Sequence, residues 1–92
     1  MEATKFYILQ QYIPNGKKVY EGECTNVYYA EIDGKDKIWL AQPERATRFN
    51  TIGEAMKVSA RLSTENKGIY FKAIPIYDES VLTKKNKSLN KN

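Results

Sequence analysis

The chain has no histidine and only one cysteine, Cys24, among its 92 residues. Histidine is the usual general base of enzymes and a common zinc ligand, so its absence excludes Ser–His and Cys–His catalytic pairs and leaves too few ligands for a zinc site. A single cysteine also excludes an intramolecular disulfide, and small secreted domains usually contain several. The sequence therefore predicts no catalytic residue, no metal and no cofactor, and it favours a cytoplasmic location.

Other common signatures are missing too. The five glycines are isolated, so no glycine-rich loop could hold a phosphate. No run approaches the roughly 20 apolar residues of a membrane span, and the polar opening is unlike a signal peptide. Glu21 and Glu23 flank Cys24 and would raise a thiol pKa, which favours a half-buried structural thiol over a nucleophile.

The net charge of +4 comes entirely from the end of the chain. Positions 1–83 carry 11 basic and 11 acidic residues, and the excess consists of Lys84, Lys85, Lys87 and Lys91. The apolar pattern also stops after Glu79. We therefore expect a single domain over residues 1–80 and a disordered lysine-rich tail over 81–92.

The first half of the chain has the composition of β-strands. Residues 5–13 are rich in aromatic and β-branched side chains and predict a strand that ends at Pro14-Asn15-Gly16. Residues 17–23 predict a weaker return strand, in which Gly22 is a candidate bulge.

A hairpin is predicted around Asp33-Gly34, between strands at 27–32 and 37–41. A two-residue loop would place Glu31 opposite Asp36, which is a like-charge pair, whereas a four-residue loop avoids that pair. Both loops give the same two faces, and a three-residue loop would exchange them. The face expected to point to the core contains Val27, Tyr29, Ile38 and Leu40, and the half-exposed face contains Tyr28, Ala30, Ile32, Lys37, Trp39 and Ala41.

An amphipathic helix should follow the hairpin. Thr51 and Glu54 match a capping box, and the helix is expected from Ile52 to about Thr64. Asn66-Lys67-Gly68 provides the stop signal. The stripe predicted to face the sheet consists of Ile52, Ala55, Met56, Ser59 and Leu62, with Val58 beside it, while Gly53, Lys57 and Arg61 should face water.

Residues 68–77 predict a closing strand that is an edge or contains a bulge, because Pro75 cannot donate a ladder hydrogen bond. The expected fold class is α+β, with an antiparallel sheet of four to five strands, one α-helix packed on one face, and the order strands-helix-strand. A monomer is favoured, and a homodimer through this strand is the alternative.

Two surfaces are candidates for function. Tyr28, Trp39 and Ile32 on the second hairpin face could dock a protein, stack against nucleic-acid bases, or be covered by the N-terminal strands or the tail. The basic residues Arg45, Arg48, Lys57 and Arg61, together with Lys84, Lys85 and Lys87 of the tail, could bind anions or nucleic acid. The neutral charge of positions 1–83 argues against the second interpretation.

The segment Ala46-x-x-Phe49-x-Thr51-x-x-Glu54-Ala55, which follows a tyrosine-rich hairpin, resembles small accessory proteins of phages that infect Gram-positive bacteria. The resemblance covers residues 5–77. It implies no catalytic residue, and it implies a protein that binds a host protein and inhibits or redirects it. Together with the missing catalytic groups, it predicts a small protein-interaction module, with weak nucleic-acid binding as the alternative.

Overall fold

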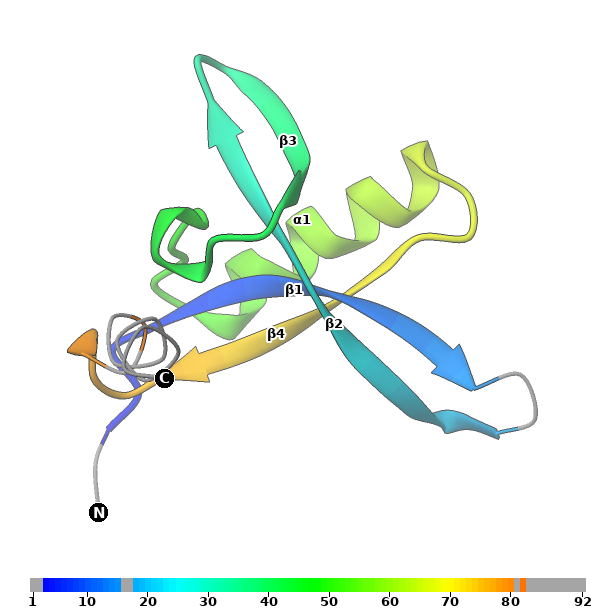
Figure 1. The fold of residues 1–92 in the computed structure, drawn as a ribbon, viewed down its shortest axis with the longest axis horizontal. Helices are drawn as coiled ribbons and strands as arrows, with labels where there is room; N and C mark the ends of the chain where they lie inside the picture. Colours follow the sequence, from blue (N-terminus) through cyan, green and yellow to red (C-terminus); the bar gives the residue numbers. More distant parts are fainter. Residues whose placement is uncertain (1–2, 16–17, 81, 83–92) are drawn as a thin grey trace, which may run out of the picture.

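A computed structural model describes residues 3–15, 18–80 and 82. Within these residues, four antiparallel strands form one sheet in the order β3-β2-β1-β4 (Figure 1). The predicted α+β fold is confirmed, with its helix between the third and fourth strands. The elements are β1 (Phe6–Asn15), β2 (Lys18–Ile32), β3 (Lys35–Leu40), the short 3₁₀-helix η1 (Pro43–Arg45), α1 (Ile52–Glu65) and β4 (Tyr70–Ile76).

The two strands predicted over 17–23 and 27–32 are one long strand, β2. Its first part pairs with β1 and its last part pairs with β3. Between the pairs Gln10–Tyr28 and Tyr12–Cys24, β2 contains two residues more than β1, and the Gln10 side-chain amide donates to the Thr25 carbonyl there. This bulge lets β2 turn away from β1 without leaving that carbonyl unpaired.

Pro14 was expected to end the first strand, but it lies inside β1 opposite Gly22. A second register shift separates this pair from the pair Asn15–Lys18, so Gly22 does border an irregularity, as predicted. The loop that joins the two strands falls at 16–17, outside the described residues.

The segment before α1 fills the space where β1 and β2 separate. The Thr47 amide donates to the Tyr29 carbonyl at 3.1 Å, and the Thr47 hydroxyl accepts from the Glu31 amide at 2.6 Å. On the other side, Tyr7 and Phe49 exchange two backbone hydrogen bonds of 2.8 Å. The backbone groups freed by the divergence of the strands therefore find partners within the same sheet.

Strand β4 lies at one edge of the sheet, which is one of the two positions that Pro75 allowed, and it still pairs with β1 at Pro75 and Ile76. Pro75 is opposite Tyr7, and Tyr7 directs both its N–H and its C=O to Phe49. The missing N–H of Pro75 therefore costs the ladder no hydrogen bond from Tyr7.

Helix α1 begins at the predicted capping box. The Thr51 hydroxyl accepts from the Glu54 amide at 3.1 Å, and the Glu54 carboxylate accepts from the Thr51 amide at 3.3 Å. The helix ends at Asn66, and Gly68 takes a φ of +85°, a conformation that glycine adopts without strain. The predicted stripe is only partly right, because Ile52 and Met56 are half exposed.

Both faces of the sheet are covered. The face under α1 carries one apolar cluster, and the opposite face carries a second cluster, which covers Tyr28 as one of the three alternatives allowed. Tyr28 and Ala30, expected on a half-exposed face, are therefore buried. Leu82 is also buried, two residues past the expected end of the domain, while 81 and 83–92 of the expected tail lie outside the described residues. The helix-side cluster is Leu9, Tyr29, Ala55, Leu62 and Phe71, and the far-side cluster is Phe6, Ile8, Tyr28, Ala46, Ile76 and Leu82.

Truncation of Leu62 to alanine tests the helix-side cluster. Leu62 is fully buried between α1 and the sheet, so we expect Leu62→Ala to lower the free energy of unfolding by about 2–5 kcal/mol in urea titrations. Lys57→Ala, on the exposed side of the same helix, should change it by less than about 0.5 kcal/mol. A loss of under about 1 kcal/mol for Leu62→Ala would contradict this packing.

Candidate functional site

The β2–β3 hairpin closes with a tight two-residue turn. Asp33 and Gly34 have φ angles of 55° and 76°, which is the pattern of a type I′ turn. This register places Glu31 opposite Asp36, the like-charge pair that a longer loop would have avoided. A positive charge near the pair would offset this repulsion.

Arg61 of α1 supplies that charge. Its guanidinium holds the Asp36 carboxylate with two hydrogen bonds of 2.9 and 3.2 Å, and it also contacts Glu65 at 3.2 Å. The buried Tyr29 hydroxyl donates to the same carboxylate at 2.9 Å. A two-pronged Arg–carboxylate pair fixes orientation as well as distance. Asp36 therefore ties the hairpin to the helix.

The pKa values of the three groups reflect this arrangement. The hydrogen bonds from Arg61 and then from Tyr29 lower the pKa of the Asp36 carboxyl below its usual value. Burial, followed by the hydrogen bond to Asp36 and its negative charge, raises the pKa of Tyr29 to about 12. The folded state therefore favours an ionised Asp36 beside a neutral Tyr29.

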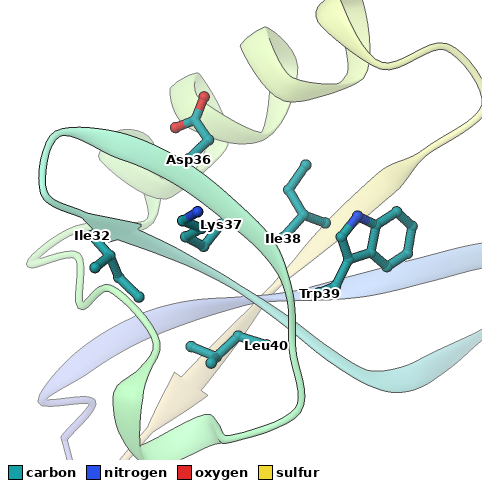
Figure 2. Close-up of a pocket in the computed structure, with 6 residues that line it drawn as sticks. All are labelled: Ile32, Asp36, Lys37, Ile38, Trp39 and Leu40. Atoms are coloured by element: carbon teal, nitrogen blue, oxygen red, sulfur yellow. The ribbon is translucent and has the colours of Figure 1, made fainter.

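A bulge in β3 decides where Trp39 points. Between the pairs Ala30–Lys37 and Tyr28–Leu40, β3 contains one extra residue. In Figure 2, Ile38 and Trp39 leave the ribbon of β3 on the same side, and Leu40 leaves on the other. The face assignment from the sequence is thus wrong beyond Ile38, because no loop length predicts a bulge inside the strand.

Trp39 lies beside an open hollow of about 390 Å³ along β3. The indole is 71% exposed, the most exposed of the large apolar side chains that the structure describes. The hollow is lined by five consecutive residues, 36–40, and by Ile32 (Figure 2). Because successive side chains of a strand alternate between faces, this hollow is lined from both faces of β3, with one residue from the neighbouring strand β2.

The predicted docking set of Tyr28, Trp39 and Ile32 is only partly brought together. Trp39 and Ile32 both line the hollow. Tyr28 is 5% exposed and packs with Ala46 and Leu82, so it is a core residue and cannot present its ring to a partner. Its covering comes from distant segments, which the local strand pattern does not show.

The structure does not gather the predicted basic set on one surface. Arg48 pairs with Glu79 at 2.7 Å and lies over the ring of Phe6, on the face away from α1. Arg61 is bound to Asp36 on the helix side. Of the rest, Arg45 donates to Gln42 at 3.4 Å, Lys57 is exposed on α1, and Lys84, Lys85 and Lys87 lie outside the described residues.

The exposure of Cys24, the grouping of metal-ligand residues and the character of the helices complete the description of the surface. Cys24 is exposed, which corrects the expectation of a half-buried thiol. Among the described residues, no three potential metal ligands come together. Within the same residues, no helix has the length and apolar character to cross a membrane.

The sequence analysis missed two features of the molecule. Lys35 and Lys37 are exposed on the edge strand β3, where Lys37 lines the hollow, and their alternation with Asp36 was the available signal. Ile52 and Met56 help to line a second hollow of about 450 Å³ between α1 and β4, where the helical stripe had predicted burial.

The raised pKa of Tyr29 predicts a specific loss of stability in alkali. A group whose pKa rises from 10 in the unfolded chain to about 12 in the fold stabilises the fold below pH 10, and this stabilisation is lost between pH 10 and about 12. The free energy of unfolding of the wild type should therefore fall by up to about 3 kcal/mol more than that of Tyr29→Phe over this range. Tyr77→Phe, at an exposed site, is the control, and equal slopes for all three proteins would refute the assignment.

Comparisons with protein-family models, with curated proteins and with solved structures find no match to this chain. No family assignment follows, so a function must be argued from the surfaces described above.

Proposed function

We propose that this protein is a small non-catalytic interaction module that binds a partner protein through the Trp39 edge, defined as Trp39 and the hollow along β3. The carrying observation is the 71% exposure of Trp39 beside an apolar hollow. Tryptophan is enriched among the residues that dominate the binding energy of protein interfaces, and an exposed tryptophan loses unfavourable hydration when a partner covers it.

Two features support a binding role for this edge. The hairpin that carries Trp39 is held to α1 through Asp36, Arg61 and Tyr29, so the edge is in place before a partner arrives. A preorganised surface avoids part of the entropy that association costs. The hollow also combines apolar side chains with the charged Lys37, which is the mixture typical of a small docking site.

The alternative of nucleic-acid binding has less support. Arg48 and Arg61 already pair with carboxylates, on opposite sides of the sheet. The resemblance to phage accessory proteins stays a prediction, and on that reading the partner would be a protein of the bacterial host.

Capture from a nuclease-treated lysate of the source or host cell tests the proposal. The immobilised wild-type chain should retain at least one protein that Trp39→Ala loses. Tyr77→Ala is the matched control, because Tyr77 is also an exposed aromatic residue but lies away from β3. All three proteins should have the same thermal unfolding midpoint within a few degrees, since both substitutions are at exposed sites.

Retention of the same proteins by the wild type and Trp39→Ala would contradict the proposal. Retention from an untreated lysate that is absent from the nuclease-treated lysate would instead favour the nucleic-acid alternative.

A further inference from the structure

We infer that the partner binds by adding an extended strand to the free edge of β3, and that this strand alternates acidic with apolar side chains. The inference rests on the proposed function and specifies its mode and its partner chemistry. It combines a strand edge that no described strand pairs with, a hollow along that strand and two lysines that form no ion pair with a described residue.

Strand β3 is an edge of the sheet, and no other strand of the described residues pairs with its outer side. The type I′ turn makes Ile32 and Lys35 the hydrogen-bonded pair of the hairpin, so the next pair, Glu31 and Asp36, is of the non-bonded kind. The N–H and C=O of Asp36 are therefore directed away from β2, where an added strand could bond to them.

The charges at this edge select an acidic strand. Lys35 and Lys37 are exposed on the same face of β3, two residues apart, and neither forms an ion pair with a described residue. The Asp36 carboxylate between them is already held by Arg61 and Tyr29. Acidic side chains at alternate positions of an added strand would lie opposite both lysines.

Nearby acids do not cancel this preference. Glu31 belongs to β2, one strand farther from the open edge, and Asp33 lies in the turn that precedes β3. The other face of the edge presents Ile38 and Trp39, so the intervening positions of the added strand should be apolar.

The same lysines disfavour a second copy of this chain as the occupant. Two β3 strands paired edge to edge would bring Lys35 and Lys37 of one copy close to the same residues of the other. Like charges placed across from one another destabilise a strand pair, and edge lysines commonly prevent self-association in this way.

Binding of synthetic peptides to the full chain tests the inference, with the emission of Trp39, the only tryptophan, as the readout. The probe is a short capped peptide in which Glu and Val alternate. Its counterparts are the Lys–Val peptide and a Glu–Val peptide methylated on every amide nitrogen. We expect saturable binding of the first peptide alone, weakened by added salt.

Substitution of the edge lysines should weaken that binding. Lys35→Gln combined with Lys37→Gln should raise the dissociation constant about 2- to 30-fold, which corresponds to the loss of two exposed ion pairs. Lys84→Gln, Lys85→Gln and Lys87→Gln together form the matched control, because they remove the same kind of charge from the end of the chain. This control should leave the dissociation constant unchanged.

Each contrary result overturns the strand model. Equal binding of the acidic and basic peptides removes the charge preference, and equal binding of the methylated peptide removes the backbone pairing. Sensitivity to the 84–87 lysines alone places the acidic site elsewhere, and a wild-type dimer that Trp39→Ala dissociates makes a second copy the occupant. If no peptide binds while lysate capture still depends on Trp39, strand addition is wrong and the proposed function stands. If no peptide binds and lysate capture does not depend on Trp39, strand addition and the proposed function are both wrong.

Discussion

The bond between Asp36 and Arg61 is the interaction on which the exposed edge of this molecule depends. Asp36 lies on an outer strand, and Arg61 lies on the helix that covers the sheet. The tight turn brings the carboxylate of Glu31 opposite that of Asp36. The ion pair with Arg61 and the hydrogen bond from the Tyr29 hydroxyl offset the repulsion between the two carboxylates. Without the positive charge of Arg61 the two carboxylates would repel across the hairpin, and the register that presents Trp39 would lose its support.

A β-bulge separates the outer part of the same hairpin from β1. The bulge near Thr25 turns β2 away from β1, and the segment through Thr47 and Phe49 fills the gap with backbone hydrogen bonds. Figure 1 shows the β2–β3 hairpin rising away from β1 and β4 as a result. No strand of the described residues pairs with the far side of β3, which is the geometry that strand addition needs.

Much of the fold follows from local sequence signals. The capping box at Thr51, the restriction that Pro75 places on its strand and the Asp33-Gly34 turn each act within a few residues, so the sequence alone predicts them. The burial of Tyr28 and the register at Asp36 depend instead on partners far along the chain. Leu82 covers the first and Arg61 neutralises the second, and a strand pattern contains neither piece of information. The sequence also identified Trp39 as a candidate but assigned it to the wrong face, because it does not predict the bulge inside β3.

Amide hydrogen exchange at Asp36 tests the central claim most directly, because it reports on the strand edge rather than on side chains. In the free protein this amide should exchange rapidly, since it faces solvent, while the amides of Ala30 and Lys37 inside the ladder should be protected. On saturation with a bound partner segment, the account predicts strong protection of Asp36. An Asp36 amide that remains unprotected in a complex still dependent on Trp39 would contradict strand addition.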